Sequence, residues 1–435
     1  SISTKLLFIT LLAFAGKSCL AYDDDKASEK KFDLTVRGFA DLSLALTDKY
    51  ASWLDYGTSK GRYGGDGDRK LQITVPEAQV VLDLRYGPHV NLHTSIKYGD
   101  QQANTLDILE AYVKFKSGPL SQPQWSLKLG SFFPPISLEN TAIGWTSPYT
   151  LSSAAINAWV GEELRINGAE LRARFRFDKF DVDILGAGFF ANDAAGSLLG
   201  YRGWAIHDHE LGLFGHAPLP QYQLEIRNPN GAFRGQSHRF QLTHEIDGNV
   251  GAYLGTVLKS KTLGKLQFLA YDNNGDPEAF NRTEGQYAWD TRFLALGYQR
   301  DFLAKYRVIL QSMLGETVMG PKIYFQRASR NISSRIVDAK FFSAMGLVNR
   351  RFGDKSLSLR GEYFEMRDND AIRQVYDNAE SGYAFTATGN WRMHKRLKLS
   401  LEVQYIDHER PVRRFAFEPE EIGELSSRLN LRAFF

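Results

Sequence analysis

The stretch LSSRLNLRAFF, residues 425–435, alternates between two kinds of side chain. Counting back from Phe435 in steps of two gives residues that are nearly all apolar, and the residues between them are mostly polar. A period of two is the side-chain period of a β-strand with one apolar and one polar face. Because a free chain end is usually frayed and polar, a segment that stays apolar up to a final aromatic residue predicts a strand held in a sheet.

The same alternation recurs along the chain, most clearly at 33–46, 89–98, 169–177 and 396–405. One face carries Leu, Val, Phe and Ala, and the other carries Arg, Lys, Glu and His. A soluble sandwich turns its apolar faces inward, whereas a transmembrane barrel turns them toward lipid and keeps a polar lumen. Periodicity alone does not separate the two, but aromatic strand ends and strands of about ten residues favour the barrel.

The N-terminal region has the features of a secretory signal peptide. Lys5 precedes the apolar run LLFITLLAFAG (6–16), and small residues precede a cleavage position after Ala21. We therefore expect a signal peptide over 1–21, a flexible tail over 22–32 and the barrel over 33–435. Cys19, the single cysteine, falls in the predicted signal peptide, so we expect no disulfide.

Short and long connections alternate between the predicted strands. Short turns are expected at 83–90, 177–181, 259–265, 300–305, 350–356 and 392–397. Longer polar stretches are expected at 47–70, 134–163, 191–219, 274–286, 315–334, 368–380 and 409–421. Short turns at one rim and long loops at the other are typical of outer-membrane barrels. About seventeen strands are clear and 221–227 adds one more, which predicts about 18 strands, with 16 as the alternative.

Charge and motifs argue against several other classes of protein. Lys and Arg number 53 against 50 Asp and Glu, so nothing suggests a nucleic-acid partner. No Ser–His or Asp–His spacing points to an active site, so we expect neither an enzyme nor a cofactor or metal. In HDHE (207–210), His207 and His209 share one face of a strand and could bind a metal together; a solvated loop is the favoured interpretation.

Four segments carry a resemblance to a known family: the signal peptide, RGFADLSLAL (37–46), EAYVKFKSGPLSQPQWSLKLGSFFPP (110–135) and RLNLRAFF (428–435). Together they resemble Gram-negative outer-membrane porins, and the hairpin at 110–135 is similar to that of the phosphate-selective porin group. The resemblance implies a passive diffusion channel for small hydrophilic solutes, located in the outer membrane and assembled as a homotrimer. It also implies contact with outer-membrane lipid and lipopolysaccharide, and Phe435 as a signal to the barrel assembly machinery.

Porins often fold one long loop into the lumen, and 134–163 is the candidate here. It holds Trp145 and Trp159, which a solvent-exposed loop would rarely carry. We expect Glu139, Glu162 and Glu163 near the constriction. The alternative is that this loop packs against a neighbouring subunit at the centre of a trimer.

Alternation places a set of cations on the lumen face: Arg37, Lys128, Arg165, Arg172, Arg174 and Arg176. Cations in a channel with low-dielectric walls attract anions, so an anion preference is one prediction. A charge ladder with Asp181 and Asp183 on the next strand is the competing one. The alternative functions are an outer-membrane hydrolase of the phospholipase or protease type, a non-conducting structural barrel and a secreted β-sandwich binding protein.

Overall fold

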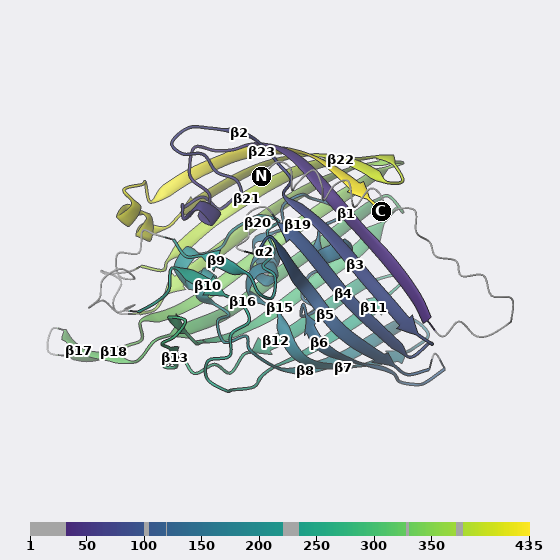
Figure 1. Cartoon of the computed structure of the whole chain (residues 1–435), viewed down its shortest axis with the longest axis horizontal. Helices are drawn as coiled ribbons and strands as arrows, with labels where there is room; N and C mark the ends of the chain where they lie inside the picture. The colour runs from purple at the N-terminus through teal and green to yellow at the C-terminus, as the bar shows by residue number, and fades with distance from the viewer. Residues whose placement is uncertain (1–31, 100–103, 119, 221–234, 328–329, 371–376) are drawn as a thin grey trace.

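A 17-stranded antiparallel sheet closes into a barrel in the computed structural model (Figure 1). The structure describes residues 32–99, 104–118, 120–220, 235–327, 330–370 and 377–435. Sixteen strands form the wall, and β2 (Leu71–Thr74) pairs only with the end of β1. The wall strands are β1 (Phe32–Leu46), β3 (Glu77–Tyr86), β4 (Val90–Gly99), β5 (Leu106–Lys116), β6 (Gln124–Phe132), β7 (Ile166–Arg176), β8 (Phe180–Phe190), β11 (Gly251–Ser260), β12 (Gly264–Asp272), β15 (Trp289–Phe302), β16 (Tyr306–Met319), β19 (Val337–Phe352), β20 (Lys355–Asp368), β21 (Glu380–His394), β22 (Leu397–Glu409) and β23 (Glu421–Phe434).

Shorter elements lie in the connections. The strands among them form three small hairpins: β9 (His216–Pro218) with β10 (Arg239–Gln241), β13 (Phe280–Asn281) with β14 (Gln286–Tyr287), and β17 (Ile323–Arg327) with β18 (Arg330–Ser334). The helices are η1 (Trp53–Asp55), η2 (Ile143–Trp145), α2 (Ala155–Glu163), α3 (Ser197–Arg202) and η3 (Pro411–Ala416). None of the helices in the described residues combines the length and the apolar character that a membrane span requires.

Pairing between the first and last strands closes the barrel. The register runs from Phe39↔Phe434 to Leu46↔Ser427, and β8 pairs with β11 across the long connection between them. The prediction of an antiparallel barrel is confirmed, with the alternative count of 16 wall strands rather than about 18. The segment 221–227, expected to be a strand, lies outside the described residues, as do the predicted signal peptide and residues 22–31 of the predicted tail.

The apolar face of each wall strand points outward. On β22 and β23, Leu401, Val403 and Leu429 are 54%, 44% and 39% exposed, whereas the alternate residues Glu402 and Asn430 are buried inside. A sandwich would bury the leucines against a second sheet, so that alternative is wrong. The outward stripes match a lipid-facing surface, and the polar stripes face the lumen.

The predicted turns and loops separate to opposite ends of the barrel. Tight turns join β3 to β4, β7 to β8, β11 to β12, β15 to β16, β19 to β20 and β21 to β22, and the chain end at Phe435 lies beside these turns (Figure 1). The long connections emerge at the other end. Since short turns face the periplasm in outer-membrane barrels and long loops face outward, this polarity assigns the two ends.

The seam between β1 and β23 includes a close contact at Gly38. The amide of Gly38 donates to the carbonyl of Phe435 at 3.0 Å, and the amide of Phe435 donates back at 3.1 Å. A Cβ on Gly38 would lie 2.3 Å from Cζ of Phe435 and 2.4 Å from the carbonyl oxygen of Gln79. The absence of a side chain at residue 38 therefore lets the terminal ring lie over the first strand.

We predict that Gly38→Ala destabilises the barrel by about 1–3 kcal/mol, because the added methyl group forces the seam apart. The measurement is the folded fraction after refolding into detergent micelles, read from the mobility of the unheated protein on a denaturing gel. Gly389→Ala is the matched control, since a Cβ there meets nothing within 4 Å. Equal folded fractions for the two variants would contradict the prediction.

Candidate functional site

Two long connections fold into the barrel interior instead of standing outside it. The first inner segment (residues 133–165) contains α2, and the second inner segment (residues 191–220) contains α3; every residue of both helices is buried. Figure 1 places α2 between the near wall of β3–β5 and the far wall of β16 and β19. These two segments therefore occupy the interior at the long-loop end.

The first inner segment crosses the lumen from wall to wall. On one side, the Gln267 side chain on β12 donates to the carbonyl of Ile136 at 2.7 Å. On the other side, the Glu402 carboxylate on β22 accepts the amides of Leu151 and Ser152 at 2.6 and 2.9 Å. The alternative of a loop packed against a neighbouring subunit does not fit a segment bonded to opposite walls of its own barrel.

Arg360 on β20 fixes the start of α2. Its fully buried guanidinium donates to Glu139 at 2.6 Å and to Glu362 at 2.9 Å. The Glu362 carboxylate in turn accepts the amide of Ala155, the first residue of α2, at 2.7 Å. Since Ala154 offers no side-chain cap, a wall carboxylate takes over this function and complements the helix dipole.

The last two residues of α2 link the inner segments to each other. Glu162 forms a bidentate pair with Arg202 of α3 at 2.9 and 2.7 Å. Glu163 accepts the amides of Gly196 and Leu198 at the start of α3, at 3.3 and 2.7 Å. Both glutamates are completely buried, so they join two loops rather than line an open passage. Burial raises the pKa of Glu163 to about 7.

The two tryptophans of the first inner segment have structural contacts. Trp159 is 1% exposed and packs edge-on against Phe293 of β15 and Phe341 of β19, with ring centroids 5.5 and 5.4 Å apart. Trp145 stacks on Phe133 at 3.9 Å. The apolar side of the inner segments is thus fixed to the wall formed by β12 to β19.

The HDHE motif lies in the second inner segment, and the interpretation as a solvated loop is wrong. His207 and His209 are each 2% exposed. Asp208 pairs with Arg428 of β23 at 2.6 Å, and Glu210 pairs with Lys97 of β4 at 2.6 Å. Buried carboxylates need partners, and cations projecting inward from the wall supply them, so the motif anchors the segment.

The predicted cations Lys128, Arg172 and Arg174 lie on the inner wall toward the short-turn end. Together with Lys114, Lys259 and Lys265 they form a cluster that we call the basic wall, spread over β5, β6, β7, β11 and β12. Lys114 stands directly opposite Lys128, and Lys259 directly opposite Lys265. Cross-strand pairs of like charge are unfavourable without a counter-charge.

Two carboxylates partly neutralise the basic wall. Asp183 pairs with Arg174 at 2.6 Å and with Lys259 at 3.2 Å, and Glu170 lies 3.4 Å from Arg172. The predicted charge ladder between β7 and β8 is therefore present at Asp183, which pairs with Arg174 and lies 3.8 Å from Arg172, whereas Asp181 stands opposite Arg176 without an ion pair to any described residue. Lys114 and Lys265 form no ion pair with any described residue, and both side chains are half-buried.

The remaining predicted cations lie apart from this cluster. Arg37 is half-exposed and pairs with Asp83 at 2.6 Å, and Arg176 is exposed at the short-turn rim. Arg165 is fully buried at the end of the first inner segment, with its guanidinium 3.4 Å from the ring centroid of Phe133. Arg165 precedes β7 and therefore does not follow the alternation of that strand.

Several inward-facing residues were not among the predicted site residues. Lys114 shares its strand face with Tyr112, and Arg360 and Glu402 share theirs with other polar residues. The period-two pattern could have placed all of them in the lumen. Their contacts with the inner segments depend on tertiary structure that the pattern does not contain.

Small cavities separate the inner segments from the wall formed by β1, β22 and β23. One of about 40 Å³ is lined by residues that include Arg62, Asp208, Glu402 and Arg428. A second, of about 10 Å³, again touches Asp208 and is lined by Arg432 and other polar groups. Polar cavities of this size suit water molecules, so this side of the inner segments meets a polar boundary.

One group of carboxylates in the described residues is close enough to share a metal ion. Ligand atoms of Asp193, Glu245 and Asp247 lie within 4.8 Å of one another. However, Asp193 already accepts the amides of Ile246 and Asp247, which accounts for its place in the turn. The expectation of no metal or cofactor stays a prediction.

Comparisons with known proteins support the barrel assignment. The family model described as "Putative beta-barrel porin-2, OmpL-like" matches residues 222–429. No curated protein sequence matches the chain.

Two solved structures share the fold. The outer membrane channel DcaP of Acinetobacter baumannii is 9% identical, with 94% of this chain and 99% of that chain covered and a TM-score of 0.54. OmpTdeltaL8, a loop-deletion mutant of an outer membrane protein of Vibrio cholerae, is 8% identical, with 93% and 100% covered and a TM-score of 0.51. The chain thus shares the fold of these outer-membrane barrels, in agreement with the description of the family model, and its likeness to the phosphate-selective group in particular is not confirmed.

We predict that the inner segments are held less firmly as the pH rises. Because the pKa of Glu163 is about 7 when it is buried and near 4.5 when it is released, the packed state keeps a proton that the released state loses between these values. Packing should weaken over this range by up to about 3 kcal/mol and change little above pH 7. The measurement is hydrogen exchange of the α2 amides, corrected for intrinsic rate.

Glu163→Gln should reduce this pH dependence, because glutamine cannot ionise. Asp193→Asn is the control: burial raises the pKa of Asp193 to about 6, but its carboxylate is bonded to the 246–247 turn rather than to α2. An unchanged pH profile in Glu163→Gln would show that another group governs α2.

Proposed function

We propose that this protein is a passive diffusion channel for small hydrophilic solutes in the outer membrane, with its constriction formed by the two inner segments. The observation that carries the proposal is the polar boundary between these segments and the wall of β20 to β23. The porin-type barrel and the family model support the general class. No chemical reaction enters the proposal, and we infer that the protein is not an enzyme.

The contacts of the inner segments suggest where solutes pass. On the β12–β19 side, Trp159 and its aromatic neighbours form apolar packing that excludes water. On the β20–β23 side, the first inner segment is held by hydrogen bonds and ion pairs, such as Asn390 to the carbonyl of Tyr149 at 2.8 Å and Arg432 to Thr146 at 3.0 Å, although Phe364 of β20 and Ile406 of β22 also belong to the apolar cluster. Water and ions replace polar contacts more readily than apolar ones, so we assign the route to this side.

We further propose a modest preference for anions. The basic wall contributes six cations, and the carboxylates that face the same space are Glu170, Asp183, Glu110 and Asp181. Within this set the difference is 6 − 4 = +2, and Arg176, which stands opposite Asp181, adds further positive charge at the short-turn end. A fixed positive charge in a confined channel raises the local concentration of anions.

A non-conducting structural barrel is the second candidate. It is favoured by the small size of the cavities beside the inner segments, about 40 and 10 Å³. Homotrimer formation, and recognition of Phe435 by the barrel assembly machinery, stay predictions that the porin resemblance supplies.

We predict discrete conductance steps when the purified protein is inserted into a planar bilayer, and larger steps for Arg360→Met. Removing the guanidinium leaves Glu139 and Glu362 buried without their partner, which costs about 3–5 kcal/mol and loosens the first inner segment. Arg351→Met is the control, because Arg351 lies at the exposed short-turn end and donates to the carbonyl of Ala304.

If neither the wild type nor Arg360→Met shows conductance steps, the result favours the non-conducting structural barrel. If the wild type conducts and Arg360→Met gives the same step size, the first inner segment is not the constriction.

We predict a reversal potential in a salt gradient that indicates anion preference, reduced by Lys114→Gln combined with Lys265→Gln. These two lysines supply positive charge without an ion-pair partner in the described residues, so their loss removes two of the excess positive charges. Arg300→Gln with Arg350→Gln, on the outward face, is the control and should leave selectivity unchanged. A cation-selective wild type would contradict the proposed role of the basic wall.

A further inference from the structure

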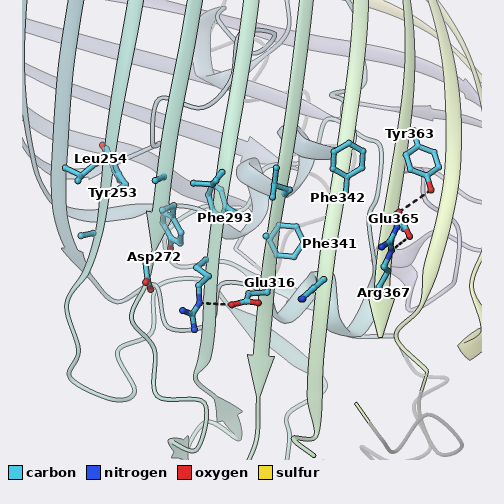
Figure 2. Close-up of a pocket in the computed structure, with 18 residues that line it drawn as sticks. Tyr253, Leu254, Asp272, Phe293, Glu316, Phe341, Phe342, Tyr363, Glu365 and Arg367 are labelled. Carbon is cyan, nitrogen blue, oxygen red and sulfur yellow. Dashed lines mark hydrogen bonds and ion pairs between the residues drawn. The ribbon is translucent and has the colours of Figure 1, made fainter. Parts of the chain in front are cut away.

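A groove of about 980 Å³ runs across the outward face of the barrel over β11 to β20 (Figure 2). The small side chains of Ala252 and Ala270 form the bottom of the groove. Its sides are lined by Leu254, Leu294 and Leu314, which are 69%, 43% and 54% exposed. The groove is thus an apolar hollow on the surface that faces lipid.

A belt of charged residues borders this groove at the long-loop end. Five residues stand opposite one another on five successive strands: Asp272, Arg292, Glu316, Lys340 and Arg367. Asp272 is the last residue of β12, directly before a long connection. By the polarity of the barrel, the belt lies at the surface of the outer leaflet, and the groove lies deeper among its acyl chains.

The charges of the belt are paired on one side, and on the other side two cations, Lys340 and Arg367, are accompanied by one carboxylate, Glu365. Arg292 pairs with Glu316 at 3.1 Å, and Figure 2 shows this pair together with the contact between Arg367 and Glu365. Lys340 stands directly opposite Arg367 and forms no ion pair with any described residue. Because Glu365 offsets the charge of Arg367 alone, the positive charge of Lys340 beside it is left without a partner among the described residues, and an anion there would be favourable.

We propose that this groove binds a phosphorylated lipid of the outer leaflet, with an acyl chain in the apolar hollow and a phosphate between Lys340 and Arg367. The apolar groove and the cationic pair are adjacent and follow the order of acyl chain and headgroup along the membrane normal. Each basic residue near an anionic headgroup strengthens binding, and apolar burial of the chain adds to it.

The charged belt argues against a second copy of the chain as the occupant. A protein partner covering the groove would also desolvate Lys340, Arg367 and Asp272, and buried charges without matched partners oppose association. A lipid phosphate at the membrane surface leaves these groups in contact with water. The proposal goes beyond conduction and holds whether or not the channel conducts.

The test uses the full-length protein in detergent micelles with two probes, bisphosphorylated lipid A and its enzymatically dephosphorylated form. Bound lipid is counted by native mass spectrometry. Lys340→Gln with Arg367→Gln should weaken binding of the phosphorylated probe about tenfold or more and leave the dephosphorylated probe unaffected. The control, Arg300→Gln with Arg350→Gln, removes two outward cations at the opposite end of the same wall and should change neither affinity.

A second variant tests the hollow itself. Ala270→Trp should weaken both probes, because the indole fills the groove that the acyl chain occupies. Equal binding of both probes to the wild type, or unchanged binding in Lys340→Gln/Arg367→Gln, overturns the proposal. The oligomer mass of Ala270→Trp is also compared with that of the wild type by size exclusion with light scattering. If the variant changes the oligomer mass but not the amount of bound lipid, the proposal is overturned and the groove is an interface between copies.

Discussion

The structure depends on a ring of backbone hydrogen bonds that has no open edge. Lipid offers no partner to an unpaired N–H or C=O group, so a sheet in a membrane must close on itself. Closure falls to β1 and β23, the first and last strands of the described chain, whose register extends over eight residue pairs from Phe39↔Phe434 to Leu46↔Ser427. Because the barrel is closed, the alternation in its strands turns the leucines outward to lipid and the charged residues inward to the lumen.

Closure of the barrel also places many charged side chains in its interior, where each needs a partner of opposite charge. Ion pairs between the inner segments and the wall supply these partners: Glu139 with Arg360, Asp208 with Arg428 and Glu210 with Lys97. Buried pairs of this kind contribute little net stability, but breaking one leaves an unmatched charge. They therefore define one position for each inner segment, while the aromatic cluster around Trp159 supplies the apolar adhesion on the opposite side.

The sequence was sufficient to predict the strands of the barrel wall, but it was not sufficient to predict how the inner segments pack inside the barrel. Alternation such as Leu401, Glu402, Val403 fixes which face meets lipid, and tight turns such as 177–179 set the hairpins, because both signals are local. The entry of 134–163 into the lumen could be inferred from its tryptophans and the porin resemblance. The entry of 191–220 could not, since the polar motif at His207–Glu210 is equally compatible with solvent, and its partners Lys97 and Arg428 come from distant strands.

The order of contacts along the chain has a consequence for biogenesis. The inner segments precede β20 to β23, yet Arg360, Glu380, Glu402 and Arg428, which anchor those segments, lie on these last strands. The inner segments therefore reach their final contacts only when these last strands are in place. Completion of the wall and packing of the interior are thus coupled, because the strands that finish the barrel also carry the side chains that hold the inner segments.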